Sequence, residues 1–473
     1  MTERARCDIV IVGAGRAGVQ TASSLRDEGF GGQILVVGDE AAAPYDRPPL
    51  SKAFLSGQES LDDTTLHGEG FYETQRIGLR TGTRAVGLDR QAGTLLLSDG
   101  QEVGYSRLVL ATGARNRPLP FPGGGLRGVV SLRTAANAAA LRAALAAARR
   151  VVVIGGGFIG LEVASVAARG YGCQVTVVEA LPRLMSRAAL PQSAARARRN
   201  LESLGVRVLT GTAIAAVHAA DGPSAGRTST GRHSADRPRA ADGVYTADGA
   251  FIPADLVVYG IGVLPNTGLA EDAGLAVADG VLVDETLRTA DPRVWAIGDC
   301  AAFPRPAYPI PAGAGPDGPN PDGTATVRLE SVQNATDQAR HVARALATGA
   351  AAPYRALPWF WSDQGELRFQ SVGLTAGHDR TVVLGDPDSD SFSVLAFRDG
   401  QLLGADSLSA AGDHRALRRL LGTERSQWAA AVTPEACQAP GFVLRDVLRG
   451  LASPARPTGR AGPVPPGRGT RTH

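Results

Sequence analysis

The sequence predicts an α/β fold in which two doubly wound parallel-sheet domains are followed by a small α+β domain at the C-terminal end. An internal repeat supports the first part, because a run of β-branched residues, a glycine turn, a helical pattern and a second apolar strand occur twice, beginning at Asp8 and at Val151. Continuous apolar strands beside helices are typical of a parallel sheet buried on both faces. Strand-like runs at 381–384 and 393–397, followed by helical patterns at 415–421 and 443–451, predict the last domain.

The first repeat places a glycine loop, Gly13-Ala14-Gly15-Arg16-Ala17-Gly18, between two apolar strands. In such a loop Gly13 permits a tight turn, Gly15 lets the backbone approach a pyrophosphate, and Gly18 lets the helix pack on the strand. The N–H groups at the start of the helix are then free to bind the anion. Asp39 follows Gly18 by 21 residues, where a carboxylate can accept a hydrogen bond from a ribose hydroxyl. The unit is predicted to be a Rossmann-like dinucleotide-binding fold.

The second repeat has the same order of strand, glycine loop, helix and strand as the first. Its loop is Gly155–Gly160, and its second strand ends at Glu179. A carboxylate at this place accepts both ribose hydroxyls and repels a 2′-phosphate, which favours NAD over NADP. Arg183 and Arg187 lie just beyond and either soften this preference or belong to an exposed helix face. Two dinucleotide folds in one chain predict two dinucleotides, with electrons passing between them.

Composition excludes several classes of protein. Of the 473 residues, 44% are apolar and 20% charged, which is a globular balance. The formal charge is +3, and the last 21 residues hold four arginines and no acid, so binding to nucleic acid or to a membrane is not predicted. Four scattered cysteines show no disulfide framework or metal-ligand spacing, and no metal is predicted. No signal-peptide pattern and no apolar stretch near the ~20 residues that span a bilayer occur, which predicts a cytoplasmic protein.

Three short segments indicate that the first dinucleotide is FAD. The strand at 107–110 ends in Ala111-Thr112-Gly113, small residues where the chain crosses between domains. The strand at 294–296 is followed by Gly298-Asp299, where the aspartate can accept a hydrogen bond from a ribityl hydroxyl and the glycine permits close approach. Finally, Gly260–Asn266, which includes Gly262, closes the second fold as 111–113 closes the first.

Four further segments carry a family resemblance: PYDRPPLSK at 44–52, GGGFIGLE at 155–162, LESVQNA at 329–335 and WFWSDQ at 359–364. With them, the chain resembles the FAD-dependent, NADH-linked ferredoxin reductases that serve Rieske-type dioxygenases and bacterial cytochrome P450 systems. These putidaredoxin reductase-like proteins are a branch of the glutathione reductase-like flavoproteins. The resemblance runs from about residue 7 to residue 451, apart from two insertions.

The resemblance implies that NADH delivers hydride to flavin N5 and that single electrons then pass to a [2Fe–2S] ferredoxin serving an oxygenase. It also implies FAD contacts at Ala17, Asp39, Lys52, Ala85, Arg133, Asp299 and Val332. Together with the loops and strand ends, the predicted FAD site comprises Gly13, Gly15, Ala17, Gly18, Asp39, Lys52, Ala85, Ala111, Thr112, Gly113, Arg133, Gly298, Asp299, Val332 and Trp361. The predicted NAD site comprises Gly155, Gly157, Phe158, Ile159, Gly160, Glu179 and Gly262.

The predicted domains follow from these assignments. The FAD-binding domain is made of residues 6–115 and 264–347, the NAD-binding domain of 116–263, and the C-terminal α+β domain of 348–452. Three stretches, 219–243, 304–323 and 453–473, are rich in Gly, Ser, Pro or Arg. They are predicted to be two mobile insertions and a disordered tail.

Lys52 is the only lysine among 49 basic residues, and it lies inside one of the four segments. A lysine near flavin N5 can pair with Glu162, two residues after the second glycine loop, and these two are the predicted catalytic residues. Arginine there would be bulkier, with a planar fork in place of a point charge. The alternative is a surface lysine placed by chance.

Aromatic side chains near the predicted site leave alternatives open. Phe158 either shields the contact between flavin and nicotinamide or packs in a core. Trp359 and Trp361 either lie beside the isoalloxazine or anchor the last domain.

Missing cysteines narrow the reaction. Disulfide reductases of this superfamily carry a redox cysteine pair after the first dinucleotide unit, and the segment 41–45 has none. Cys300, beside Asp299, is interpreted as a small buried residue. Without a thiol relay, electrons should leave the flavin directly to an outside one-electron acceptor. The alternatives are reduction of rubredoxin or another small carrier, and a redox-responsive interaction protein resembling apoptosis-inducing factor.

Overall fold

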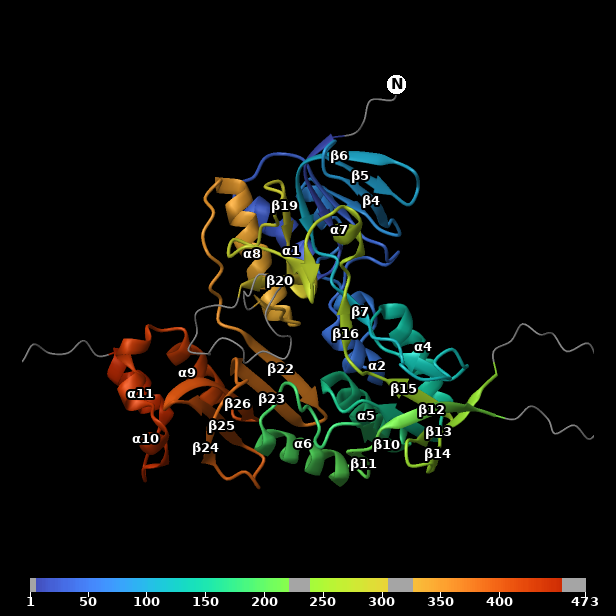
Figure 1. Cartoon of the computed structure of the whole chain (residues 1–473), viewed down its shortest axis with the longest axis vertical. Coiled ribbons are helices and arrows are strands. Elements are labelled where there is room, and N and C mark those ends of the chain that lie inside the picture. Colours follow the sequence, from blue (N-terminus) through green and yellow to red (C-terminus); the bar gives the residue numbers. More distant parts are fainter. Residues whose placement is uncertain (1–5, 221–238, 305–325, 453–473) are drawn as a thin grey trace, which may run out of the picture.

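The computed structural model describes residues 6–220, 239–304 and 326–452 of the chain. Three main sheets organise these residues (Figure 1). The first lies at one end of the molecule, and the second and the C-terminal sheet lie near each other at the other end. The predicted α/β fold, with two parallel-sheet units and a separate α+β unit, is confirmed.

The first sheet has seven strands in the order β3–β2–β1–β6–β5–β4, with β19 also paired to β6. Strands β1, β2, β3, β6 and β19 pair in parallel, and β4 and β5 form an antiparallel extension on β6. Their bounds are Arg6–Val12 (β1), Ile34–Val37 (β2), Ile77–Arg80 (β3), Ala85–Asp89 (β4), Thr94–Leu97 (β5), Glu102–Leu110 (β6) and Val294–Ala296 (β19).

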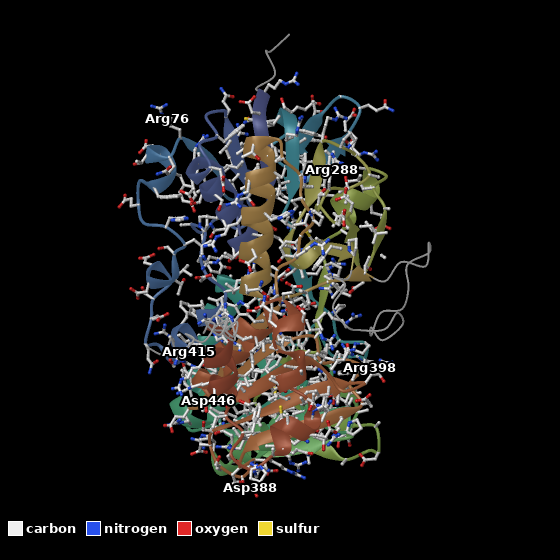
Figure 2. All side chains as sticks on the ribbon, turned by 90° about the vertical axis from the view of Figure 1, so that its left-hand side faces the viewer. Arg76, Arg288, Asp388, Arg398, Arg415 and Asp446 are labelled. Carbon is white, nitrogen blue, oxygen red and sulfur yellow. The ribbon has the colours of Figure 1, made fainter. Side chains whose placement is uncertain are left out.

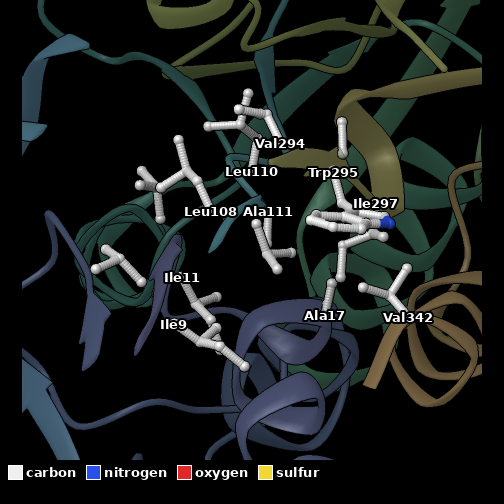
Figure 3. Close-up of a cluster of buried hydrophobic side chains, with 14 of the residues drawn as sticks. Ile9, Ile11, Ala17, Leu108, Leu110, Ala111, Val294, Trp295, Ile297 and Val342 are labelled. Carbon is white, nitrogen blue, oxygen red and sulfur yellow. The ribbon is translucent and has the colours of Figure 1, made fainter. Parts of the chain in front are cut away.

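The core of the first unit lies between this sheet and two helices, α1 (Arg16–Asp27) and α8 (Val332–Thr348), which contact each other. Figure 3 shows side chains of β1, β6 and β19, among them Ile9, Leu108 and Val294, gathered with Ala17 of α1 and Val342 of α8. All four residues of β2 are buried, as a parallel strand covered on both faces requires. The continuous apolar runs of the sequence therefore predicted these strands correctly.

The second sheet is entirely parallel, in the order β11–β10–β9–β15–β8. Its strands are Val129–Ser131 (β8), Arg150–Ile154 (β9), Gln174–Glu179 (β10), Arg207–Thr210 (β11) and Leu256–Tyr259 (β15). Its helices are Ala135–Ala147 (α4), Phe158–Tyr171 (α5) and Pro191–Ser203 (α6). A smaller antiparallel sheet is formed by Ile214–Ala219 (β12), Ala241–Thr246 (β13) and Phe251–Pro253 (β14).

The predicted insertions need a correction at their edges. Ala219 ends β12 and residues 241–243 begin β13, so both ends of the 219–243 stretch belong to a hairpin of paired strands. Pro304 likewise ends strand β20 (Ala301–Pro304). Residues 221–238, 305–325 and 453–473, to which most of the three stretches belong, lie outside the described residues.

Short elements connect the two parallel units. Strands β7 (Ala114–Asn116) and β16 (Val263–Pro265) pair antiparallel where the chain crosses between the units. Side chains lock this crossing, because Thr112 Oγ1 donates to the carbonyl of Asn266 (2.7 Å) and Asn266 Nδ2 donates to that of Thr112 (2.9 Å). The remaining short elements before residue 330 are Pro48–Ser51 (η1), Ala53–Ser56 (α2), Asp62–Thr64 (η2), Phe71–Thr74 (α3), Gly268–Asp272 (α7), Val277–Ala278 (β17), Gly280–Leu282 (β18), Gly298–Cys300 (η3) and Thr326–Val327 (β21).

The C-terminal unit is a five-stranded antiparallel sheet in the order β22–β23–β26–β25–β24. Its strands are Trp359–Gln364 (β22), Leu367–Gly373 (β23), Arg380–Gly385 (β24), Phe392–Arg398 (β25) and Gln401–Leu408 (β26). Helical segments follow at Ala411–Leu421 (α9), Arg425–Gln427 (η4), Ala429–Ala431 (η5), Pro434–Gln438 (α10) and Leu444–Ala452 (α11). Both predicted strands and both predicted helices of this unit are confirmed.

The C-terminal sheet is buried on both faces. Val394 and Ala396 of β25 join a core that includes residues of α5, whereas Leu395 and Phe397 join a second core with α9. Strand alternation thus packs one face on the second parallel unit and the other on the C-terminal helices.

Charged side chains of both signs are interspersed over the face seen in Figure 2, from Arg76 and Arg288 at one end to Asp388 and Asp446 at the other. Within the described part of the chain, we find no helix with the length and apolarity that crossing a bilayer would need.

Candidate active site

A cavity of about 780 Å³ lies where the two glycine loops and the C-terminal sheet come together. It is lined by residues of both parallel units and by Phe360 and Trp361 of β22. Of the predicted site residues it brings together Gly13, Gly15, Ala17, Asp39, Lys52, Ala111, Thr112, Gly113, Arg133, Gly157, Phe158, Ile159, Gly160, Glu162, Gly262, Gly298, Asp299, Val332 and Trp361. Residues spread from position 13 to position 361 therefore share one cavity.

The first glycine loop has the form that a dinucleotide needs. A Cβ at Gly13 would lie 2.1 Å from the carbonyl oxygen of Ala111, and one at Gly18 would lie 1.8 Å from that of Gly13. Only glycine permits these two approaches. A Cβ at Gly15 would meet no atom within 4 Å, so this position faces open space. Gly15 is also the N-cap of α1 without a side-chain hydrogen bond, which leaves the first N–H groups of the helix available to a phosphate.

The second loop repeats this geometry. A Cβ at Gly155 would lie 2.4 Å from the oxygen of Gly260, one at Gly160 would lie 2.3 Å from that of Gly155, and one at Gly157 would meet nothing within 4 Å. Gly157 is the N-cap of α5, again without a side-chain cap. Both loops therefore have an open anion-binding position at a helix N-terminus, as expected for FAD and for a nicotinamide dinucleotide.

Four predicted site residues do not line the cavity. Gly18 and Gly155 support the loops from behind, as their contacts show. Ala85 begins β4 and is partly buried against the core of the first unit, so the FAD contact predicted for it stays a prediction. Glu179 is turned onto the second loop, where its two carboxylate oxygens accept the N–H groups of Gly156 (2.7 Å) and Leu181 (2.8 Å).

The arginines after Glu179 lie in a loop and not on a helix. Residues 180–190 form a loop between β10 and α6, so an exposed helix face was the wrong expectation. Arg183 is half-buried and donates to the carbonyl oxygens of Ala189 (2.6 Å) and Ser186 (3.0 Å). Arg187 is exposed, near Gly262 of the cavity wall.

Lys52 and Glu162 form the predicted ion pair. Lys52 Nζ lies 2.9 Å from Glu162 Oε1, and the side chains are 22% and 2% exposed. Two hydroxyls also donate to this carboxylate: Ser51 Oγ to Oε2 (2.5 Å) and Ser362 Oγ to Oε1 (2.5 Å). The prediction missed both serines, although each is adjacent to a residue that it named.

Asp299 and Arg133 form a second ion pair in the cavity wall, with 2.7 Å between Nη2 and Oδ2. Arg133 also donates from Nε to the carbonyl of Ala114 (2.9 Å), at the crossing between the units. Gly298, with φ +71°, donates its N–H to Gln338 Oε1 (2.7 Å) on α8. These bonds fix the turn that presents Asp299 to the cavity.

A polar network near Asp39 was not predicted. Asp39 is 60% exposed, whereas the neighbouring Glu40 accepts hydrogen bonds from Tyr45 (2.5 Å) and Arg47 (2.9 Å). Burial, together with the bond to Glu40, raises the pKa of Tyr45 to about 12. Arg47 also donates to the carbonyl of Arg133 (2.7 Å). The sequence segment 44–52 could have indicated this network, because it contains Tyr45 and Arg47, whose polar side chains are not needed to form a turn.

The aromatic side chains near the site differ in where they lie. Trp361 lines the cavity, while Trp359 packs against Trp361 and His414 and has the guanidinium of Arg418 3.9 Å above its ring. Phe158 lines the cavity and also contacts Phe360 (4.6 Å between ring centroids), so it packs against a neighbouring aromatic side chain, and its shielding of a flavin–nicotinamide contact stays a prediction.

All four cysteines belong to the described residues, and all are free. None of them lines the cavity. Cys300 is completely buried, and burial raises the pKa of its thiol, which disfavours the reactive thiolate. Over the described ranges, no group of three or more His, Cys, Asp or Glu side chains could hold a metal ion.

The comparisons with known proteins agree with this geometry. The family model described as pyridine nucleotide-disulphide oxidoreductase matches residues 7–339, and the one described as reductase C-terminal matches residues 359–448. The chain belongs to the pyridine nucleotide-disulphide oxidoreductase family. It is therefore an oxidoreductase that uses FAD and a nicotinamide dinucleotide, as predicted.

Individual relatives extend over nearly the whole chain. Rhodocoxin reductase of Rhodococcus erythropolis is 45% identical over 437 residues, 92% of this chain and 93% of that protein. Rubredoxin-NAD(+) reductase of Pseudomonas putida is 37% identical over 401 residues, 85% of this chain and 95% of that protein. The crystal structure of a covalent putidaredoxin reductase–putidaredoxin complex matches with a TM-score of 0.80 and 35% identity, over 95% of this chain and 100% of that one. The predicted resemblance to putidaredoxin reductase-like proteins is confirmed.

Proposed function

We propose that this protein is an NADH-dependent reductase that passes electrons through FAD to a [2Fe–2S] ferredoxin, which in turn serves an oxygenase. The observation that carries the proposal is the cavity itself, because both glycine loops open into it and none of its lining residues is a cysteine. Without a thiol beside the cavity, no cysteine pair can take electrons from the flavin there. Its electrons must leave the flavin directly, and a small one-electron carrier protein is the acceptor that fits.

FAD belongs in the part of the cavity formed by the first unit. Gly15 and the free N-terminus of α1 bind its pyrophosphate, and Asp39 or the adjacent Glu40 faces the adenosine ribose. Asp299, held by Arg133, accepts from the ribityl chain. When bound, FAD accepts a hydride from NADH and returns electrons singly. Trp361 of the C-terminal sheet lines the same cavity, where its ring would limit access of water to the bound FAD.

NADH belongs on the second loop, with its pyrophosphate at Gly157 and the N-terminus of α5. Glu179 gives the preference for NADH over NADPH, because its carboxylate is fixed beside the loop by two backbone N–H groups. Arg183 does not neutralise this carboxylate, since its guanidinium is used by carbonyls of its own loop.

Lys52 and Glu162 are the proposed catalytic pair. Lys52 supplies the positive charge that stabilises negative charge developing at the reacting end of the cavity, and Glu162 holds it there. The domain division at residues 115, 263 and 347 stays a prediction, consistent with the two parallel units and the antiparallel C-terminal sheet.

A second acceptor has a specific observation in its favour. The rubredoxin reductase relative spans 85% of this chain, so rubredoxin is the alternative carrier for the same first half-reaction.

The test measures each half-reaction separately. Anaerobic stopped-flow mixing with NADH should reduce the bound FAD, and cytochrome c reduction should then depend on an added [2Fe–2S] ferredoxin. Rubredoxin supporting the faster turnover would replace the ferredoxin in this proposal. Slow reduction by NADH followed by a long-lived flavin–NAD complex, with no stimulation by either carrier, would contradict a reductase function and favour a redox-responsive interaction protein.

A further inference from the structure

Glu162 is a buried carboxylate at the junction of three segments that are far apart in the sequence. It lies on α5, two residues after the second glycine loop, and its side chain is 2% exposed. Its partners come from η1 (Ser51 and, at its C-terminal end, Lys52) and from β22 (Ser362). A buried charge of this kind is costly unless it is paired and hydrogen-bonded.

The two serines complete the coordination of this carboxylate. Oε1 accepts from Lys52 Nζ (2.9 Å) and Ser362 Oγ (2.5 Å), and Oε2 accepts from Ser51 Oγ (2.5 Å). Over residues 6–220, 239–304 and 326–452, Lys52 is the one ion-pair partner of Glu162. Both hydroxyls are themselves buried, Ser51 at 2% and Ser362 at 0% exposure. Without them, one oxygen would have no partner and the other would depend on a lysine that is 22% exposed.

We propose that Ser51 and Ser362 are positioning residues that hold the Glu162 carboxylate in one orientation, so that Lys52 is held at the cavity. This inference rests on the proposed function, in which Lys52 acts during flavin reduction. Because charge-assisted hydrogen bonds are short and strong, two of them restrict rotation of the carboxylate.

Ser362 has a second consequence. The preceding residue, Trp361, lines the cavity, and the strand that carries both pairs with the rest of the C-terminal sheet. The bond from Ser362 to Glu162 therefore ties the C-terminal domain directly to the ion pair. Ser51 gives the matching tie from the first unit, since it immediately precedes Lys52.

A third serine provides a matched control. Ser165 lies on the same helix as Glu162, three residues later, and is equally buried (1% exposed). Its hydroxyl has no hydrogen-bond partner in the described structure. Ser165→Ala therefore removes a buried hydroxyl from the same helix without removing a bond to Glu162.

The experiment uses the FAD-loaded, full-length protein and the variants Ser51→Ala, Ser362→Ala and Ser165→Ala. Flavin reduction by NADH is followed by anaerobic stopped flow near neutral pH. Each of the first two variants should reduce the limiting rate by about tenfold, with little change in the NADH concentration at half-saturation. Ser362→Thr, which keeps the hydroxyl, should recover most of the rate.

A second measurement does not depend on activity. The Tm of the holoprotein should fall more in Ser51→Ala and Ser362→Ala than in Ser165→Ala. The first two variants leave a buried carboxylate without a hydrogen-bond donor, whereas the hydroxyl of Ser165 has no partner to lose. Equal behaviour of all three alanine variants, with normal reduction of the wild type, would overturn the inference. A wild type that NADH does not reduce would instead overturn the proposed function.

Discussion

The two glycine loops share one backbone design and differ in the side chains that follow them. In both, a Cβ on the first glycine (Gly13, Gly155) would collide with the backbone that follows the adjacent strand, and one on the third (Gly18, Gly160) would collide with the first. In both, the middle glycine of the motif (Gly15, Gly157) is a helix N-cap facing open space. The backbone alone therefore provides two equivalent dinucleotide sites.

Two residues after the third glycine the units diverge. In the first unit this position is Gln20, whose amide donates to Ser24 Oγ (2.9 Å) within the same helix. In the second it is Glu162, which joins three segments through Lys52 and two serines. The difference shows how a repeated fold becomes asymmetric: the two backbones match, but only the second helix carries at this position a carboxylate that is paired with Lys52.

The largest effect on FAD retention and on flavin reduction is expected from removing one partner of the ion pair between Lys52 and Glu162. Lys52→Met leaves Glu162 buried and without its counter-ion, which costs on the order of 3–5 kcal/mol. Part of this cost should appear as weaker FAD retention and part as slower flavin reduction. Because the two residues act as a unit, Lys52→Met combined with Glu162→Leu should recover part of the loss.

A double-mutant cycle on the reduction rate and on FAD affinity measures this coupling. Gln20→Leu, at the equivalent position of the first unit, is the control and should change the reduction rate little. Additive effects of Lys52→Met and Glu162→Leu in both quantities would show that the pair does not act as a unit.

The second unit is also held from outside, by a buried carboxylate of the C-terminal sheet. Asp406 on β26 is fully buried, and its Oδ2 accepts the N–H of Leu190 (2.7 Å) at the end of the loop that begins after Glu179. Burial raises the pKa of Asp406 to about 7, against the lowering effect of that N–H group. The ordinary pKa of an unfolded aspartate is about 3.9, so the folded state holds the proton more tightly.

The contribution of Asp406 to stability should therefore be present below pH 4 and be lost as the pH rises through about 7. Asp406→Asn keeps an acceptor for Leu190 and removes the charge. At pH 8 it should be more stable than the wild type by on the order of 2–4 kcal/mol, and the advantage should shrink towards pH 5. The measurement is the Tm of the holoprotein across this range. A Tm difference that does not vary with pH would contradict the assignment.

The glycines themselves separate folding from binding. Gly18→Ala and Gly160→Ala place a Cβ about 2 Å from a backbone oxygen and should lower stability by about 1–3 kcal/mol or more. Gly15→Ala and Gly157→Ala meet no atom and should leave Tm of the FAD-free protein unchanged. Instead, Gly15→Ala should lose FAD, and Gly157→Ala should keep FAD and raise the KM for NADH. Loss of FAD from both Gly15→Ala and Gly157→Ala would show that the two loops are not separate sites.

Sequence patterns predicted the strands and glycine loops of the two units well. Apolar runs and glycine spacing are local, so they indicated β1, β2, β9 and β10 and both loops before any contact was known. The ion pair between Lys52 and Glu162 was also accessible, since each residue lies in a distinctive segment. What local patterns could not supply was which hydroxyls reach Glu162, because Ser362 approaches from 200 positions away.

The error at Arg183 has the same origin. Arg183 was expected either to soften the coenzyme preference or to lie on an exposed helix face, but its guanidinium satisfies carbonyls of a loop that is bonded to Asp406 and Gln364 of the C-terminal sheet. Ala85 was assigned to FAD by resemblance alone and does not line the cavity, so that contact stays a prediction. Side-chain placement that depends on another domain is not encoded in the neighbouring residues.

The smallest expected effect concerns the acids at or just beyond the end of the second strand of each unit, Glu179 and Asp39. Glu179 is fixed by the backbone N–H groups of Gly156 in the second loop and of Leu181 just after its own strand, so the wild type should prefer NADH over NADPH by at least about tenfold in kcat/KM, or ~1.4 kcal/mol. Glu179→Gln keeps an acceptor for Gly156 and removes the charge that repels a 2′-phosphate, so the ratio should fall towards one. Asp39→Asn, the matching change in the first unit, should leave the ratio unchanged when FAD is saturating. If the wild type uses both coenzymes equally and Arg187→Ala restores the preference, then Arg187 neutralises Glu179 and the selectivity assigned to the carboxylate is wrong.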